Sequence, residues 1–237
     1  MQWQDQGIVL AVKQFSESSR IVTVFAKSIG KTSGLVKSIK SSIQIGDVCD
    51  ITWRGRNLES LGTFKIENLF SPFAFVFNNP KELFALESAC ALCLSGLPER
   101  APHEKLFDEL KVLFFSITQE NWLADYVIFE KNFLTEVGMG LNLSKCAVTG
   151  QKTGLKYVSP KTGRAVVQDV GEKYKNKLFS LPEFMLDGAN RNPSTDEIFL
   201  GLNMTGHFLN MYFSSVSNKN LPLSRNYLID ALRNGAA

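Results

Sequence analysis

The stretch that decides the fold is residues 15–38, which read FSESSRIVTVFAKSIGKTSGLVKS. Two runs of β-branched and apolar residues, one at 20–26 and one beginning at 34, are separated by a polar segment that contains a glycine. Runs of this kind, bounded by serine and glycine, are typical of short strands joined by tight turns. The stretch therefore predicts two neighbouring strands.

Three further runs of the same kind flank it, at 7–12 (GIVLAV), 47–53 (DVCDITW) and 63–70 (TFKIENLF). About five short strands in about 70 residues predict a small closed or partly closed barrel, and the oligonucleotide-binding (OB) barrel is one such architecture. An SH3-like barrel would give much the same pattern. Five aromatic residues lie among the basic residues of this region, and we expect most of them in the core and one or two on the surface: Phe15, Phe25, Trp53, Phe64 and Phe70.

Beyond the barrel region the apolar residues recur at spacings of three and four, which is typical of amphipathic helices. The segments with this spacing are 83–97, 106–117, 123–137, 173–181, 197–211 and 221–232. Residues 145–171 are rich in glycine and carry only short extended pieces, so they predict a small ribbon. The predicted fold is α+β, with a five-stranded OB barrel at 1–75 and a helical domain at 76–237 that contains the ribbon. We expect the helices on either side of the ribbon to pack as one bundle.

The chain has 237 residues, 44% of them hydrophobic and 21% charged, as in ordinary globular proteins. It has no apolar run near the roughly 20 residues that span a bilayer, and its N-terminus lacks the features of a signal peptide. We therefore expect a cytoplasmic protein without a membrane partner.

The net charge of +3 is unevenly distributed along the chain. Residues 1–70 carry +3, residues 71–144 carry −5, residues 145–177 carry +6 and residues 178–237 carry −1. Basic zones attract phosphate backbones irrespective of sequence, so a nucleic-acid partner is indicated. A lysine-rich face that merely solvates the protein is the other interpretation.

The cysteines and histidines offer little chemistry. Cys90 and Cys93 form a C-x-x-C inside a segment of helical period, and Cys49 lies in a predicted strand, so all three are expected in the core. Cys146 could begin a zinc knuckle, but Thr149 stands where a second cysteine would be needed and no cysteine follows. Structural zinc requires four ligands, so we expect no metal and no other cofactor. No nucleophile, phosphate-loop or dinucleotide motif is present, so we expect no enzymatic activity.

The order of these features resembles the RecO family of bacterial DNA-repair and recombination mediators. The resemblance is carried mainly by residues 15–38 and by 133–150 (FLTEVGMGLNLSKCAVTG), with the segments 83–94, 103–110 and 221–228 in the family's order. It implies an OB barrel, a helical domain and a small excursion that is a four-cysteine zinc module in many relatives, whose cysteines this chain has lost apart from Cys146.

The resemblance also implies a function in the RecF pathway: binding single- and double-stranded DNA, annealing complementary strands and assisting RecA loading. The implied partners are RecR and the C-terminal tail of single-stranded DNA-binding protein, and the implied location is the bacterial cytoplasm at the nucleoid. An RNA-binding or ribosome-associated OB-fold adaptor is the alternative function, and a protein-only scaffold is the third.

The candidate DNA contacts are basic residues chosen by charge and position. The barrel set is Lys13, Arg20, Lys27, Lys31, Lys37 and Lys40. The ribbon set is Lys152, Lys156, Lys161 and Arg164.

Overall fold

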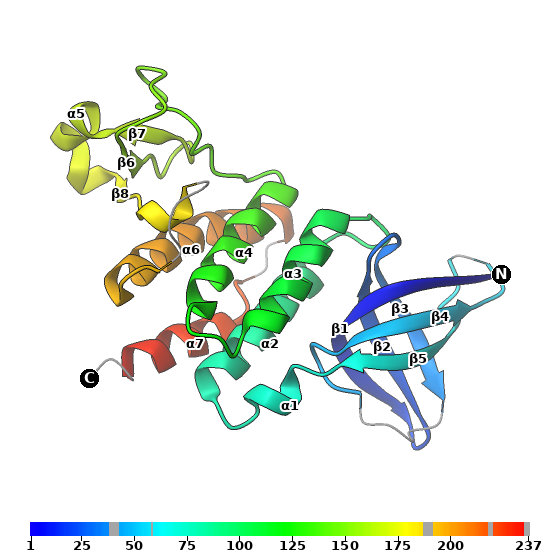
Figure 1. The fold of residues 1–237 in the computed structure, drawn as a ribbon. Coiled ribbons are helices and arrows are strands. Elements are labelled where there is room, and N and C mark those ends of the chain that lie inside the picture. The colour runs from blue at the N-terminus through cyan, green and yellow to red at the C-terminus, as the bar shows by residue number, and fades with distance from the viewer. Residues whose placement is uncertain (38–42, 58, 187–191, 218–219, 235–237) are drawn as a thin grey trace. The chain divides into compact units, whose positions relative to one another are not determined.

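A computed structural model describes residues 1–37, 43–57, 59–186, 192–217 and 220–234 (Figure 1). Their packing divides the chain into two compact units. Unit 1 comprises residues 1–118 and the C-terminal segment from 222, and unit 2 comprises residues 119–221. The division of the chain at residue 75 stays a prediction, because packing groups the first helices and the last one with the strands.

Five strands begin unit 1, and they close into a barrel in the order β1-β2-β3-β5-β4. Their bounds are β1 Gln2–Ser16, β2 Ser19–Ala26, β3 Gly30–Lys37, β4 Val48–Arg54 and β5 Thr63–Phe70. Every neighbouring pair is antiparallel except β3 and β5, which are parallel and meet at the pair Leu35–Thr63. The α+β class and the OB-type barrel are therefore confirmed, and β1 is longer than its apolar run at 7–12 predicts.

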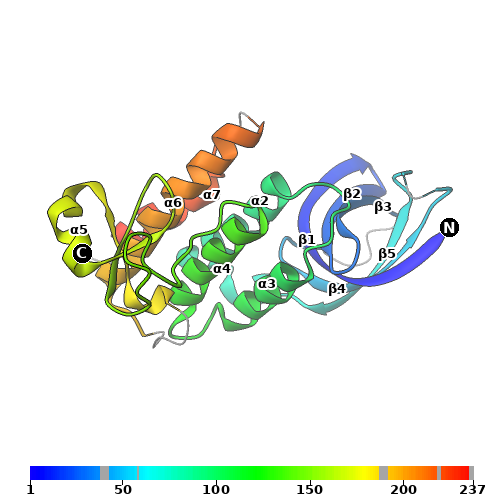
Figure 2. The same cartoon turned by 90° about the horizontal axis from the view of Figure 1, so that it is seen from above.

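Strand β1 is long because it pairs with two different strands along its length. Residues 2–8 pair with β4, whereas residues 7–16 pair with β2 (Figure 2). The register with β2 shifts between Val9 and Ala11, and an extra residue of this kind bends a strand and increases its twist. The bend lets one strand continue around the barrel.

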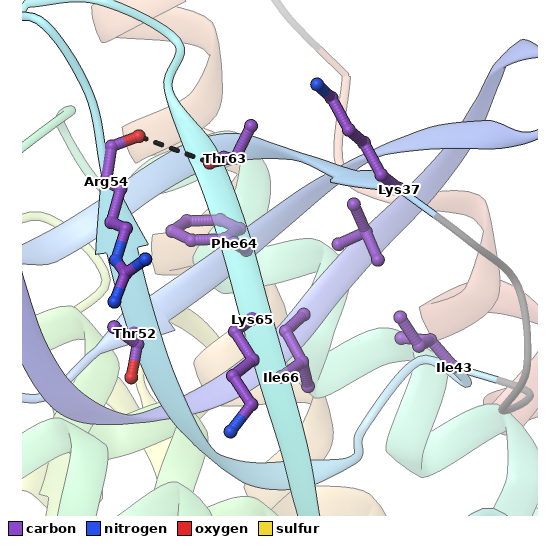
Figure 3. Close-up of a pocket in the computed structure, with 9 residues that line it drawn as sticks. Lys37, Ile43, Thr52, Arg54, Thr63, Phe64, Lys65 and Ile66 are labelled. Carbon is purple, nitrogen blue, oxygen red and sulfur yellow. Dashed lines mark hydrogen bonds between the residues drawn. The ribbon is translucent and has the colours of Figure 1, made fainter.

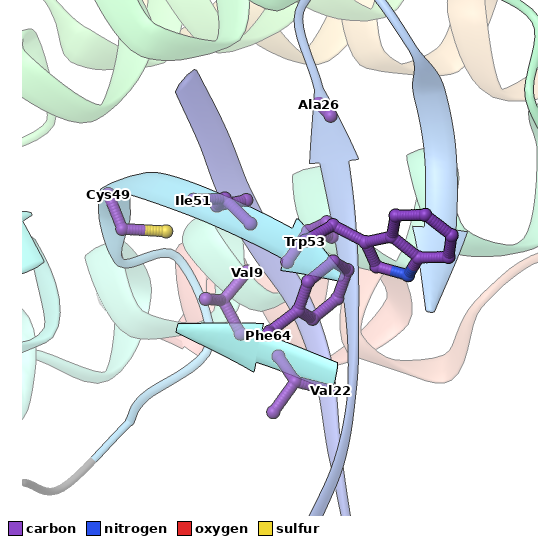
Figure 4. Close-up of a cluster of buried hydrophobic side chains, with 8 residues drawn as sticks. Val9, Val22, Ala26, Cys49, Ile51, Trp53 and Phe64 are labelled. Carbon is purple, nitrogen blue, oxygen red and sulfur yellow. The ribbon is translucent and has the colours of Figure 1, made fainter. Parts of the chain in front are cut away.

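The barrel core is filled by inward-facing residues of β1, β2, β4 and β5 (Figure 4), namely Val9, Val22, Val24, Ala26, Cys49, Ile51, Trp53 and Phe64, and Val36 of β3 packs against them. The indole Nε1 of Trp53 donates a hydrogen bond to the Leu61 carbonyl at 3.1 Å, so the largest core side chain has its one polar atom satisfied. The prediction that most of the barrel aromatics are interior is confirmed for Trp53, Phe64 and Phe25, whereas Phe15 is 62% exposed. Phe70 is partly buried and stacks between Phe75 and Phe115.

Two glycines explain why residues 15–37 fold as they do. Gly30 begins β3 with φ +86°, a backbone conformation that other residues rarely adopt. At Gly34, a Cβ atom would lie 2.6 Å from the Phe64 ring, so only glycine allows β5 to pack its phenyl ring across β3.

Four helices complete unit 1: α1 Phe73–Val76, α2 Pro80–Gly96, α3 Glu104–Ser116 and α7 Leu223–Asn234. α2 packs against α7 and against β1. The Cys90 and Cys93 side chains are buried in α2, and burial raises the pKa of both thiols, so the interpretation of this C-x-x-C as core is confirmed. On α3, Phe107 packs edge-to-face on Phe25 of the barrel, with ring centroids 5.6 Å apart.

Unit 2 contains two long helices, α4 Trp122–Glu136 and α6 Thr195–Ser217, which pack on each other. Between them lies a three-stranded sheet in the order β7-β6-β8, with β6 Leu155–Val158, β7 Ala165–Val167 and β8 Phe179–Ser180. Two short helices connect β7 to β8, α5 Gln168–Gly171 and η1 Glu172–Lys177, and a third, η2 Glu183–Met185, follows β8.

The predicted ribbon is confirmed, but it extends beyond residue 171, and the predicted helix at 173–181 is wrong. That segment is a 3₁₀ turn followed by a strand, because Phe179 and Ser180 pair with Val158 and Tyr157 of β6. A small core stabilises the ribbon and consists of Cys146, Tyr157, Val166 and Val167, with Leu155, Val170 and Leu178 packed against it. Across the described ranges of the chain, no helix has the length and apolar character needed to cross a bilayer.

Candidate nucleic-acid interface

A pocket of about 450 Å³ lies on the barrel beside β5 (Figure 3). Its lining is apolar where it meets the barrel interior, with contributions from Val36, Ile43, Phe64 and Ile66. Its polar lining consists of Lys37, Thr52, Arg54, Thr63 and Lys65. The pocket thus combines an aromatic and aliphatic floor with three cationic side chains.

Strand register explains how these cations come together. Thr52 pairs with Lys65 and Arg54 with Thr63 across β4 and β5, and directly opposed residues of an antiparallel pair point to the same face. Phe64 and Ile66 alternate with these positions and therefore face the other way, toward the core. Lys37 enters from the end of β3, where β3 and β5 have separated after their single pair.

Two of the pocket cations have polar neighbours that fix their side chains. The Arg54 Nε donates to Gln2 Oε1 at 2.9 Å, and Lys65 Nζ donates to the Glu67 carboxylate. The hydrogen bond from Lys65 lowers the pKa of Glu67, so this carboxylate is charged at neutral pH. Arg54 and Lys65 were not predicted as site residues. Part of the signal was available, since Lys65 alternates with the apolar Phe64 and Ile66 in the predicted strand 63–70 and Arg54 directly follows the one at 47–53, but the candidates were chosen from the basic residues between 13 and 40.

The residues of the predicted barrel set differ in exposure: some are exposed on the barrel, and others contact protein groups. Lys13 and Lys37 are exposed, and their pairing with Ile21 and Ser19 of β2 places both on the same outer face of β1, β2 and β3. Arg20 points to the opposite face, in line with the inward-facing Val22, and is half-buried at the end of the barrel. Lys40 lies outside the described residues.

Lys27 and Lys31 are engaged with the helices of unit 1. Lys27 Nζ lies 2.8 Å from Asp108 Oδ1 of α3, and this hydrogen bond raises the pKa of Lys27. Lys31 is only 8% exposed; its Nζ donates to the Leu94 carbonyl at 2.7 Å and lies 3.5 Å from Glu99. Both amines therefore contact protein groups that hold the barrel against α2 and α3.

The predicted ribbon set lies in unit 2, where all four side chains are exposed: Lys152, Lys156, Lys161 and Arg164. Within the part of the chain that the structure describes, none of these four has a carboxylate within ion-pair distance. The ribbon therefore presents positive charge that nearby acidic groups do not compensate.

Cys146 lies at the base of the ribbon and is 2% exposed. Its Sγ accepts hydrogen bonds from the backbone N–H groups of Val148 and Thr149 at 3.4 Å and of Val167 at 3.5 Å. Burial opposes ionisation of this thiol, but the hydrogen bonds from Thr149, Val167 and Val148 outweigh burial and lower its pKa to about 7. Among the described residues, no three His, Cys, Asp or Glu side chains are grouped so that they could hold a metal ion, so the donors of a zinc module do not come together around Cys146.

Comparison with known proteins covers most of the chain. The family model described as "Recombination protein O N terminal" matches residues 1–73, and the one described as "Recombination protein O C terminal" matches residues 78–221. The chain belongs to the RecO family. RecO relatives include proteins named DNA repair protein RecO from Wolbachia pipientis wMel, 37% identical over 97% of this chain and 99% of the relative, and from Rhodospirillum centenum, 35% identical over 98% and 95%. A third, with the same name, comes from Jannaschia sp. (strain CCS1) and is 37% identical over 98% of this chain and 96% of its own.

For the OB-type barrel of a RecO family member, the general binding surfaces of OB folds can be compared with the positions of the cations. In OB folds the strand β2–β3 face and the loops that follow β1 and β4 bind oligonucleotides. Lys13 and Lys37 lie on that face, and Arg54 is the last residue of β4. The exposed cations of this arrangement are chemically suited to contact the phosphates of a nucleic-acid strand.

Proposed function

We propose that this protein is a DNA-repair and recombination mediator that acts by binding rather than by catalysis. Membership of the RecO family supports the process, since its named relatives are DNA repair proteins. The observation that carries the molecular proposal is the barrel pocket, where Lys37, Arg54 and Lys65 surround an apolar floor of Phe64 and Ile66.

In this proposal, Lys13, Lys37, Arg54 and Lys65 contact the phosphates of single- or double-stranded DNA on the barrel. Each phosphate contact releases condensed counterions, so affinity falls with salt. The ribbon set (Lys152, Lys156, Lys161 and Arg164) provides a second DNA surface in unit 2. A protein with two cationic surfaces can neutralise two strands at once, which supports annealing of complementary strands. Lys27 and Lys31 have a structural role instead.

The family resemblance further suggests partners for this activity. We propose that the protein works with RecR, with the C-terminal tail of single-stranded DNA-binding protein and in RecA loading, at the nucleoid of a bacterial cytoplasm. Co-sedimentation of the purified chain with purified RecR, and fluorescence titration with a peptide of the tail, would test each partner separately.

The decisive experiment is a titration of fluorescently labelled single-stranded DNA with the protein at several salt concentrations. Each of Lys37→Ala, Arg54→Ala and Lys65→Ala is expected to weaken binding on all sequences and to reduce the salt slope by about 0.7, the value for one phosphate contact on a single strand. Lys105→Ala is the matched control, because this exposed α3 lysine lies outside the pocket.

Two results would contradict the proposal. Unchanged salt slopes in all three variants would remove the barrel pocket from DNA binding. Stronger competition by RNA than by DNA of the same sequence would instead favour the RNA-binding alternative, because an RNA reader uses the 2′-hydroxyl.

A further inference from the structure

The 3₁₀ helix η1, Glu172–Lys177, reads EKYKNK and is exposed at all six positions. Tyr174, at its third position, is 57% exposed. An exposed aromatic ring between lysines has the composition of a single-strand binding platform, in which a base stacks on the ring and phosphates meet the cations.

The geometry of η1 is fixed by a hydrogen-bonded trio. Tyr157 of β6 donates its hydroxyl to Glu172 Oε2 at 2.6 Å, and Lys175 Nζ donates to Glu172 Oε1 at 2.9 Å. These hydrogen bonds lower the pKa of Glu172, so its carboxylate stays charged at neutral pH and anchors η1 to the ribbon sheet. η1 is therefore held on the ribbon by contacts that do not involve Tyr174.

The same trio shows which side chains of η1 share a face. Residues three apart are eclipsed in a 3₁₀ helix, and the Glu172–Lys175 pair demonstrates this spacing directly. Tyr174 and Lys177 have the same spacing, so the ring and an ammonium group occupy one face. Lys177 has no ion-pair partner among the described residues, whereas Lys175 is neutralised by Glu172.

From this arrangement we infer that Tyr174 is a stacking site for an unpaired nucleobase and that Lys177 binds the adjacent phosphate. The inference rests on the proposed DNA-binding function and deepens it, because it assigns the ribbon a preference for single strands. Charge on the ribbon attracts any nucleic acid, but only a strand with unstacked bases can use the ring. The ribbon then distinguishes a single strand from a duplex without reading its sequence.

The test compares two labelled strands of equal length, an oligothymidylate and an abasic strand with the same phosphates and no bases. Tyr174→Leu is expected to weaken oligothymidylate binding about tenfold, as for removal of one stacking ring. The same variant is expected to change binding of the abasic strand and of a blunt duplex by less than about twofold, because their phosphate contacts remain.

Three further variants separate stacking from other effects. Tyr174→Trp, which keeps an aromatic face, is expected to retain the wild-type preference for bases. Lys177→Ala is expected to weaken both strands and to lower the salt slope by about 0.7. Tyr227→Leu is the matched control, because this tyrosine is 51% exposed on α7 and lies outside the ribbon.

Photocrosslinking locates the base directly. A strand substituted with bromodeoxyuridine is expected to crosslink to the peptide that contains Tyr174. Crosslinks confined to residues 1–118, an equal loss on both strands in Tyr174→Leu, or no loss on either strand would overturn the inference while leaving DNA binding intact. A wild-type protein without salt-dependent DNA binding would overturn the proposed function and this inference together.

Discussion

Lys31 illustrates how a basic residue can be structural, and its replacement by methionine gives a sharp prediction. The end of α2 and the two residues after it read Leu94-Ser95-Gly96-Leu97-Pro98, and the Leu94 carbonyl would in a continuing helix accept the N–H of the residue four positions later. That residue is Pro98, which has no N–H. The Lys31 ammonium donates to this carbonyl instead, at 2.7 Å, and also places a positive charge at the helix C-terminus.

The magnitude follows from these contacts. A hydrogen bond from a charged donor contributes about 1.5–3 kcal/mol, and losing it leaves a carbonyl unsatisfied. The ion pair with Glu99 adds little, because the Glu99 side chain is 62% exposed. Methionine keeps most of the Lys31 side-chain volume, so we expect Lys31→Met to lower the free energy of unfolding by about 2 kcal/mol. For a chain of this size that corresponds to a fall in Tm of about 4–8 °C.

Calorimetry measures the change in Tm, and the DNA titration described above measures the salt slope of the same variant. Lys37→Met is the control on the same strand: its exposed side chain predicts a stability change within about 0.5 kcal/mol but a reduced salt slope. The reasoning is refuted if Lys31→Met melts like the wild type and loses one phosphate contact from its salt slope.

Three other predictions concern packing and ionisation. Gly34→Ala is expected to destabilise the barrel by about 1–3 kcal/mol in urea unfolding, because its Cβ would lie 2.6 Å from the Phe64 ring. Combining it with Phe64→Leu in the same chain should recover part of the lost stability. Ultraviolet absorbance of the Cys146 thiolate, followed against pH, should reach half its maximum near pH 7, and Thr149→Val should shift that midpoint upward. An unshifted midpoint would show that Thr149 does not stabilise the thiolate. Glu172→Gln should lower Tm more at pH 7 than at acidic pH. A carboxylate whose pKa is lowered in the folded state stabilises the protein above its ordinary pKa of 4.5 and loses that effect as pH falls through the lowered pKa. A Tm difference that does not shrink with acidification would contradict this role.

Much of the barrel was predictable because strands produce a local pattern of alternating apolar and polar residues. The runs at 20–26 and 63–70 alternate inward and outward side chains, and their bounds in the structure match to within a residue. The helix predicted at 173–181 failed because its apolar spacing is also compatible with a short strand. Pairing of Phe179 and Ser180 with β6 decided between the two, and β6 lies about 20 residues earlier in the chain.

The candidate site was likewise predicted only in part from the sequence. Lys37 was predicted from charge alone, whereas Arg54 and Lys65 entered the site only when the β4–β5 register placed them beside the pocket. Lys31 was selected by charge as well, yet its amine lies at the end of a helix 63 residues away in sequence. Charge is a property of each residue, but access to a ligand depends on which distant groups surround it.

The sequence by itself determined the barrel strands and the long helices of this protein, since periodicity, turn glycines and the proline after α2 act through neighbouring residues. It also determined the two basic zones and the loss of the second cysteine after Cys146. Only the tertiary structure decided which cations remain exposed and which aromatic rings face solvent. The physical reason is that burial and hydrogen bonding are fixed by contacts between segments far apart in the chain, as when the Leu94 carbonyl binds Lys31 because Pro98 cannot supply a donor.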